Sequence, residues 1–420
     1  MGEHLGDTLV RLRRMADLTQ EALAERADVS VDTVRKLEQR RRGSATLPTL
    51  HALSRGLGVE LTTLLGDPPG VPSTGDVEPP QLVAVRRAVT PPLFAPPAEP
   101  NRTERVSPEL LRAEVADAWT LYHRAEFGRL MELLPGIITD ARFAASVGGA
   151  DEKAAGAAAL GKALQLGGHL AIRLGKTDLA LSSLERALAA ADDSGDPLLA
   201  PMIANSVAWA YQRQNRLEDA THLAVHAADG VERAHIGTSS GVRVWGGLLM
   251  SAATSFARSG DYARADDMMR TAEKAAGRLM RMPAPQDGRL VSVFSRSSVR
   301  IERVRLAVQH DRPEEALSLS RGIRLSRDTP LSWRTWLLLD VARAHTDTGN
   351  AEGAVKALES LRRVAPTWMR HHTLAVSIVT DLRDMPRRPP GLRAIAEFLG
   401  VDGYTTMRQH TGHCAPVAAP

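Results

Sequence analysis

Apolar residues recur every three or four positions along most of the chain, the spacing that places them on one face of an α-helix. The longest such stretches are rich in Ala, Leu, Arg and Glu, residues that favour helix. We therefore expect an all-α protein with almost no strand, in which helices pack through their apolar faces.

The first 66 residues carry the pattern of five short helices. Thr19 and Ser30 stand where a side-chain oxygen caps the start of a helix, and "ADV" forms a short turn between the two capped helices. The residues expected on the inner faces are Leu9, Leu12, Met15, Ala22, Leu23, Ala27, Val34 and Leu37. The outward face of the helix that Ser30 caps is then formed by Val31, Asp32, Arg35, Lys36 and Gln39.

Proline breaks the helical pattern between residues 67 and 107. It removes backbone donors and fixes extended geometry, so this stretch predicts a linker in which "QLVAVRRAV" forms a short helix or docking segment. The helical pattern resumes with a capping Ser107 followed by Pro108 in the first turn. The expected organisation is a domain over 1–66, a linker over 67–107, a helical domain over 108–402 and a disordered tail over 403–420.

Beyond the linker, a six-residue signature recurs between pairs of amphipathic stretches. Each copy begins near a turn-forming Gly, Asn or Asp and ends in a small alanine, where two helices must approach closely. The copies "GKTDLA", "NRLEDA", "GDYARA", "DRPEEA" and "GNAEGA" end at Ala180, Ala220, Ala265, Ala316 and Ala354. The pattern predicts a series of helix hairpins with connections of unequal length.

These hairpins resemble tetratricopeptide repeats, which stack into a superhelix, or α-solenoid. The match is best around Ala220, where Val207, Ala208 and Tyr211 take the large, small and aromatic positions of the first helix and Ala227 the small position of the second. Further matching residues are Gly168, Ala187, Phe256, Ala272 and Pro366.

One unit departs from the repeat pattern. Arg303 and Val304 replace its large and small residues and Ile323 replaces the small residue of its second helix, so we expect a degenerate repeat. A hairpin over residues 110–145 is expected to cap the array, and "GLRAIAEFLGV" to close its far end. The alternative is a generic helical bundle without a superhelix.

Charge and cysteine content limit the functional classes. The net charge of +4 is small, and acids and bases nearly balance in the first 70 residues, so any DNA-binding signal is local. Cys414 is the only cysteine, which excludes an internal disulfide and favours a reducing compartment. No secretory signal and no run of about 20 apolar residues is present. We therefore expect a cytoplasmic protein with no membrane partner.

The N-terminal segment resembles the helix-turn-helix domain of the Cro/xenobiotic-response-element family over about residues 5–66. The residues that carry the resemblance are, in order, "LTQEALA", the "VS" turn, the "LE" that ends the second helix of the motif, and "LPTLHALSRGLGV". Two features depart from the family pattern: Asp28, where glycine is usual, and the basic loop "QRRRGSAT". Asp tolerates the left-handed conformation, so the turn is retained. The resemblance implies a lambda-repressor-like five-helix fold that binds double-stranded DNA.

The same resemblance places the helix capped by Ser30 in the major groove, with its N-terminal half against base edges. Arg35 or Lys36 would donate to guanine, Asp32 would accept from cytosine and Val31 would contact a thymine methyl. Gln20 would fix a phosphate, and the arginine run would follow the DNA backbone. The expected DNA-binding residues are Gln20, Ser30, Val31, Asp32, Thr33, Arg35, Lys36, Arg40, Arg41 and Arg42.

Each of these assignments has an alternative. Asp32 and Lys36 are spaced i, i+4 and can pair with each other on the helix surface. The arginine run can be a solvated loop, and Val31 can be partly buried against the preceding helix.

The repeat domain is expected to bind an effector on its concave surface, which the first helix of each unit normally lines. Amides suit a peptide backbone, arginine a carboxylate, and an aromatic ring an apolar group. The groove-facing candidates are Gln165, His169, Arg173, Asn205, Trp209, Gln212, Arg213, Met250, Arg258 and Arg343. The alternative is that these are solvated positions and that Trp209 packs between repeats.

A helix-turn-helix domain joined to such repeats resembles transcription regulators of Gram-positive bacteria, and "SWRTWLLLDVARAHTDTGNAEGAVKAL" resembles those of actinomycetes. The resemblance implies a homodimer with a peptide, protein or small-molecule effector. No catalytic or cofactor-binding motif stands out, and His410, His413 and Cys414 are expected in the disordered tail rather than at a metal site. The rival interpretation is an interaction scaffold whose N-terminal domain binds DNA weakly or not at all.

Overall fold

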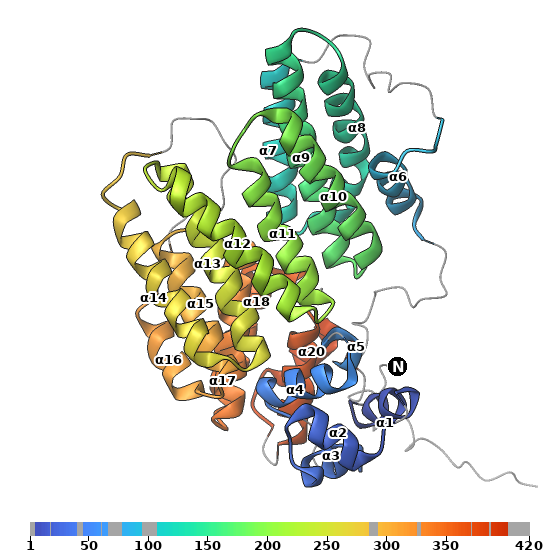
Figure 1. Cartoon of the computed structure of the whole chain (residues 1–420). Coiled ribbons are helices and arrows are strands. Elements are labelled where there is room, and N and C mark those ends of the chain that lie inside the picture. Colours follow the sequence, from blue (N-terminus) through green and yellow to red (C-terminus); the bar gives the residue numbers. More distant parts are fainter. Residues whose placement is uncertain are drawn as a thin grey trace, which may run out of the picture.

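The computed structural model describes residues 5–16, 18–39, 45–59, 61–65, 78–94, 107–284, 293–325, 329–370, 372–385 and 388–401. Within these ranges the chain forms 21 helices and no strand, which confirms the predicted all-α class (Figure 1). A five-helix N-terminal unit, here called the head, lies against a larger array of helix hairpins, here called the body (Figure 1).

The head is a small helical domain around one apolar core. Thr19 and Ser30 cap their helices as predicted, accepting hydrogen bonds from the backbone N–H groups of Ala22 and Thr33. Asp28 ends the first of these two helices in the left-handed conformation, at φ 52°. The helices of the head are α1 (Leu5–Met15), α2 (Gln20–Ala27), α3 (Val31–Glu38), α4 (Leu47–Leu57) and α5 (Leu61–Leu65).

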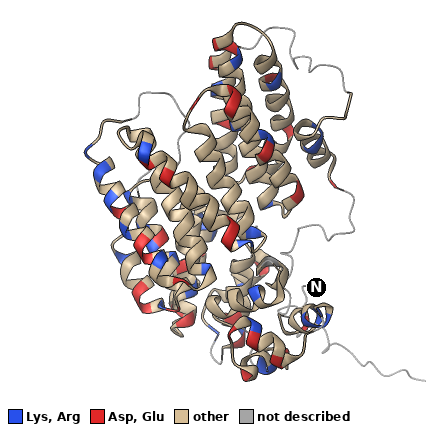
Figure 2. Cartoon of the chain, in the orientation of Figure 1, with Lys and Arg blue, Asp and Glu red and all other residues tan. Residues whose placement is uncertain are grey.

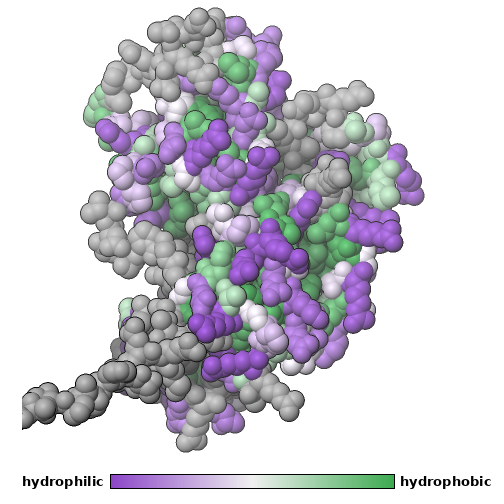
Figure 3. All heavy atoms as spheres, turned by 180° about the vertical axis from the view of Figure 1, so that it is seen from behind, coloured by the Kyte–Doolittle hydropathy of each residue, from purple (hydrophilic) through white to green (hydrophobic). Residues whose placement is uncertain are grey.

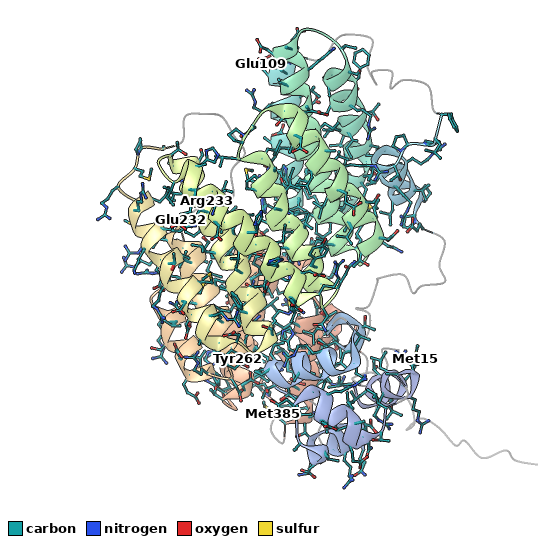
Figure 4. The ribbon with its side chains drawn as sticks, viewed as in Figure 1. Met15, Glu109, Glu232, Arg233, Tyr262 and Met385 are labelled. Atoms are coloured by element: carbon teal, nitrogen blue, oxygen red, sulfur yellow. The ribbon has the colours of Figure 1, made fainter. Side chains whose placement is uncertain are left out.

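The predicted inner positions of the head are buried with two exceptions. The residues confirmed in the core are Leu9, Leu12, Leu23, Ala27, Val34 and Leu37. Ala22 is half-buried, and the prediction for Met15 is wrong, because its side chain is 75% exposed (Figure 4). Because α1 ends at Met15, this side chain lies beyond the part of the helix that is buried in the core through Thr8, Leu9 and Leu12.

A short helix, α6 (Pro80–Val89), forms within the proline-rich stretch and packs on the body. Leu82, Val85 and Val89 are buried against the first hairpins of the body. Arg86 holds the start of the segment by pairing with Glu78 at 2.8 Å. The alternative that "QLVAVRRAV" forms a docking helix is therefore confirmed.

The body is a series of antiparallel helix hairpins, in agreement with the predicted repeat architecture. Each of the five signature alanines lies near the start of a second helix and is completely buried. The six hairpins are α7 (Pro108–His123) with α8 (Phe127–Ser146), α9 (Ala150–Arg173) with α10 (Thr177–Ser194), α11 (Leu199–Arg213) with α12 (Leu217–His235), α13 (Ser239–Ser259) with α14 (Tyr262–Leu279), α15 (Arg296–Gln309) with α16 (Pro313–Arg321), and α17 (Leu331–Asp347) with α18 (Ala351–Val364).

All six hairpin turns have the same backbone geometry. The N–H of the residue after the turn donates to the carbonyl five residues earlier, at 2.8–3.0 Å, which is the bonding of a Schellman cap. Each turn places one residue in the left-handed conformation; these residues are Ala125, Gly175, Asn215, Gly260, Asp311 and Gly349. The turn residues noted in the sequence are therefore needed because of their backbone conformation.

The hairpin of α15 and α16 is distorted, as predicted for the degenerate unit. Its second helix is short and ends before Gly322. Arg303, at the position where the repeat has a large apolar residue, is half-buried and pairs with Asp266 at 3.0 Å and Glu273 at 2.8 Å. Ion pairs with α14 therefore replace part of the apolar contact.

The last helices of the chain fold back on the first hairpin of the body. They are α19 (Pro366–Arg370), α20 (Thr373–Asp384) and α21 (Leu392–Leu399). The Trp368 ring packs edge-on against Tyr122 and Phe127, and its Nε1 donates to the His123 carbonyl at 2.8 Å. The two ends of the array are thus in direct contact. Seen from behind, the middle of the body exposes apolar side chains between polar ones (Figure 3).

Candidate nucleic-acid interface and effector site

Helix α3, here called the recognition helix after the role that the sequence predicts for it, presents a polar face to solvent. Val34 and Leu37 are buried in the core of the head, so Asp32, Arg35 and Lys36 point outward. The side chains of Arg35 and Lys36 are 52% and 53% exposed. Figure 1 shows α3 on the side of the head that faces away from the body. This is the face that the sequence predicts to contact bases.

The ion pairs on this face are weak and leave the cations accessible. Lys36 Nζ lies 2.7 Å from Asp32 Oδ2, so the alternative of an i, i+4 surface pair is confirmed for the protein without DNA. Arg35 lies 3.7 Å from Glu21. Exposed pairs of this kind contribute at most about 1 kcal/mol and can be exchanged for phosphate or base contacts. Acidic and basic residues are interspersed over the head in Figure 2.

Two other predicted DNA-binding residues have structural roles at the start of α3. Ser30 Oγ accepts from the Thr33 N–H at 3.1 Å and bonds to Thr33 Oγ1 at 2.8 Å. Val31 is half-buried and packs against the head core, as its alternative assignment expected. Both residues fix the orientation of the recognition helix.

An ion pair that no local sequence pattern indicates clamps the end of α3. Glu38 accepts from Arg13 Nε at 2.6 Å and from Gln20 Nε2 at 2.6 Å, which ties α3 to α1 and α2. Burial opposes ionisation of Glu38, but the hydrogen bonds from Arg13 and Gln20 outweigh it and lower the pKa of the carboxyl group. Gln20, predicted to fix a phosphate, thus uses one of its two amide hydrogens within the head.

Several sequence predictions concern residues outside those that the structure describes. Arg40, Arg41 and Arg42 belong to this group, and the described chain resumes at Ala45. The same holds for the expected tail over 403–420, with His410, His413 and Cys414.

The head rests on the body through one face of α4. Leu47, His51 and Arg55 follow one another at intervals of four residues, so they lie on the same side of the helix. Leu47 packs into an apolar cluster of the body with Ile301 and Val304. α5 contacts α20, and in Figure 1 α4 and α5 lie between the body and the helices α2 and α3. The contact therefore leaves the recognition helix uncovered.

A buried ion cluster of the body reaches the head backbone. Arg343 donates to Asp381 at 2.5 Å and to Asp347 at 3.0 Å, and its Nη2 donates to the Ala45 carbonyl at 3.3 Å. The Arg343 side chain is 3% exposed. Two carboxylates thus balance a guanidinium that holds Ala45, near the end of the predicted basic loop.

The centre of the contact is basic and excludes a proton from His51. Arg55 donates to the carbonyl of Arg258, and Arg258 donates to the carbonyl of Gln212 at 2.7 Å. Burial lowers the pKa of His51 well below its ordinary value, and the nearby Arg258, Arg55 and Arg213 lower it further. His51 is therefore neutral at pH 7.

The ten predicted effector residues do not line one open groove. Gln165 and Gln212 are buried, and their amides donate to neighbouring helices, to Ser206 at 2.8 Å and Ser255 at 2.9 Å. Met250 is buried in the body core. The residues at or beside the contact with the head are Arg213, Arg258 and Arg343.

The remaining predicted effector residues lie on α9 and α11. His169, Arg173, Asn205 and Trp209 are all half-buried. The ring of His169 lies 5.0 Å from that of Trp209, and the Arg173 guanidinium lies 5.0 Å from the same indole. Trp209 thus packs between repeats, as its alternative assignment expected, while Arg173 and His169 stay together beside it.

One family model matches the head. Residues 4–65 match the family model described as a helix-turn-helix domain. None of the curated proteins matches the chain. No helix of the described residues is both long and apolar enough to cross a bilayer.

Three solved structures resemble the chain at low sequence identity. BtubC (BKLC) from P. vanneervenii is 18% identical over 66% of this chain and 96% of its own, with a TM-score of 0.35. A Rap protein complexed with Competence and Sporulation Factor is 11% identical over 70% of this chain and 93% of its own, with a TM-score of 0.41. The pilF protein of Pseudomonas aeruginosa is 15% identical over 62% of this chain and 94% of its own, with a TM-score of 0.32.

Proposed function

We propose that the protein is a sequence-specific DNA-binding transcription regulator of the Cro/xenobiotic-response-element family. Its head reads the DNA, and its tetratricopeptide-like body carries dimer contacts and effector recognition, of the kind found in actinomycete regulators. It acts in the cytoplasm by binding rather than by catalysis.

One observation carries this proposal: the head is held by α4 and α5, while the polar face of α3 stays exposed. A helix-turn-helix domain inserts this second helix of its motif into the major groove. The contact with the body is therefore compatible with DNA binding. Arg35 and Lys36 are the donors best placed to reach guanine edges.

A homodimer follows from the size of the reading surface. One small module contacts few base pairs, and two heads must match half-sites roughly 34 Å apart. Because the body contacts the head through Leu47 and Arg343, a change in body curvature would move the head with it. An effector would then act on the spacing of the two heads.

The proposal is tested by selecting binding sequences from random duplex DNA with the full-length protein. We expect enrichment of an inverted repeat. In the double variant that combines Arg35→Ala and Lys36→Ala, the preference for particular bases should be lost at specific positions of the enriched sequence. The control is Arg233→Ala, an exposed residue of α12 far from the head (Figure 4), which should select the same sequence as the unmodified protein.

The scaffold interpretation predicts a different result. The unmodified protein would then enrich no sequence and would bind DNA only at low salt, through phosphate contacts alone. Unchanged specificity of the double variant would overturn the assignment of Arg35 and Lys36 even if DNA binding were confirmed.

A further inference from the structure

Three helices of the body bring an aromatic ring to one guanidinium, which a fourth helix carries. Arg173, near the end of α9, lies 5.0 Å from the Trp209 ring on α11, 5.4 Å from Trp336 on α17 and 4.7 Å from Trp368 on α19. These distances are within the range of cation–π attraction. The folding back of α19 on the first hairpin brings the third indole into place. We call Arg173 and these three indoles the Arg173 cluster.

The Arg173 guanidinium has no carboxylate partner among the residues that the structure describes. Its Nε donates to the Tyr122 hydroxyl at 3.2 Å. Arg305, which also lies over Trp336 at 4.5 Å, differs because it lies 3.4 Å from both Glu302 and Asp340. Carboxylates thus balance the charge of Arg305, whereas none of the described carboxylates pairs with Arg173.

A second cation extends the cluster. Lys162 lies 5.1 Å from the Trp119 ring, and His169 joins this ring to Trp209 at 4.9 Å and 5.0 Å. Burial lowers the pKa of Lys162 to about 7, against a smaller opposing effect of Asp196. Burial also lowers the pKa of His169 well below its ordinary value, and Lys162, Arg173 and His123 add to this. Burial disfavours charge of either sign, but the effect of Lys162, Arg173 and His123 on His169 opposes only positive charge, and the same positive field would attract an anion beside Arg173.

The cluster is accessible in part. Trp368 is completely buried, whereas Lys162, Arg173, Trp209 and Trp336 are half-buried. A guanidinium donates two parallel hydrogen bonds to a carboxylate or phosphate, and flat indole faces bind an aromatic ring. The guanidinium and the indole rings lie close enough together to contact one small ligand.

We propose that the Arg173 cluster binds a small organic anion, with its carboxylate or phosphate on Arg173 and an aromatic ring against the indoles. This inference rests on the proposed effector-binding role of the body and names the chemical class of the effector. Such a ligand would bridge the first and last hairpins, because Tyr122 and Trp368 belong to opposite ends of the array. It would thereby fix the curvature of the body.

The test is isothermal titration calorimetry of the full-length protein with 2-naphthoate. The uncharged naphthalene-2-methanol, inorganic phosphate and an acetylated tripeptide ending in a phenylalanine carboxylate serve as comparison probes. We expect 2-naphthoate to bind at least about tenfold more tightly than the alcohol, since a charge-assisted hydrogen bond is worth about 1.5–3 kcal/mol. Tighter binding of the tripeptide than of 2-naphthoate would identify a peptide terminus as the source of the carboxylate.

Variants separate the site from general effects on the fold. Arg173→Met should reduce 2-naphthoate affinity at least about tenfold, and Arg173→Lys should retain part of it, because the charge is kept but the bidentate geometry is lost. The control Arg186→Met changes an exposed arginine of the same hairpin and should have no effect. Thermal unfolding of each variant checks that the fold is retained.

Equal binding of 2-naphthoate and the alcohol would overturn the inference, and so would an unchanged affinity in Arg173→Met. Failure of all probes to bind up to about 10 mM would also overturn it. None of these results affects selection of an inverted repeat, which tests the proposed DNA-binding function separately. If the anion binds and DNA selection fails, the site is supported and the regulatory role is not.

Discussion

Arg343 on α17 donates a hydrogen bond to the carbonyl of Ala45, a residue of the head that is 298 positions away in the sequence. Ala45 is buried and lies near the end of the predicted basic loop. Because Asp347 and Asp381 fix the Arg343 guanidinium, the ion cluster of the body also fixes the backbone at the end of that loop. This bond couples the repeat body to the head, which we propose reads DNA.

Replacing Arg343→Met should strongly destabilise the protein. The variant leaves Asp347 and Asp381 buried without their cation, and breaking a buried ion pair costs about 3–5 kcal/mol. Urea unfolding measures the change. Arg321→Met, an exposed arginine at the end of α16, is the control and should change stability by less than about 0.5 kcal/mol. Equal stability of the two variants would contradict the assigned role of Arg343.

The stability contribution of His51 should depend on pH. Its pKa is lowered by burial and by Arg258, Arg55 and Arg213, so the packed state requires the neutral ring. The contribution is complete above the unfolded pKa of about 6.5 and is lost as the pH falls below it, by at most about 1.4 kcal/mol per pH unit. Chemical denaturation of the unmodified protein and of His51→Gln between pH 7.5 and 5.5 tests this. We expect the difference between them to shrink or reverse as the pH falls; a constant difference would show that folding does not lower the pKa of His51.

Glu38→Gln should weaken the head. The substitution removes the charge that pairs with Arg13 and accepts from Gln20, so we expect a loss of about 1–3 kcal/mol. Differential scanning calorimetry of the full chain should show the change. Glu21→Gln is the matched control, since Glu21 is exposed and lies 3.7 Å from Arg35, and it should be nearly neutral. A larger loss for Glu21 than for Glu38 would reject the clamp.

Asp28 tests the backbone geometry of the helix-turn-helix motif. It lies in the left-handed region, at φ 52°, where β-branched residues are disfavoured. Asp28→Val should therefore cost about 1–2 kcal/mol, while Asp28→Gly should be neutral or slightly stabilising. Thermal unfolding of both variants provides the comparison. Similar stability of the two would mean that the turn adopts another conformation.

Local signals in the sequence predicted much of the fold. The capping oxygens of Thr19 and Ser30 and the buried signature alanines depend on residues close in the chain, so their roles can be inferred from spacing. Met15 shows the limit of this reasoning, because helical periodicity alone does not show where a helix leaves its core.

The arrangement of the candidate effector residues could not be predicted in the same way. Arg173 meets Trp336 and Trp368 only because the last helices return to the first hairpin, and no local pattern shows that return. Likewise, Arg343 has the spacing of a groove residue but contacts the head. The one local signal of that contact is Leu47, an apolar residue on the face of α4 that also carries His51 and Arg55, because the core of the head itself does not use this face.

The most direct test of the DNA-reading function is the affinity ratio between the selected duplex and a scrambled duplex of equal length, measured by fluorescence anisotropy at two salt concentrations. Base readout by α3 predicts a ratio of about 10³ or more at physiological salt, with a smaller ratio for Arg35→Ala. A ratio near one, together with binding that disappears as salt rises, would mean that the head contacts only phosphates and would contradict the proposed function.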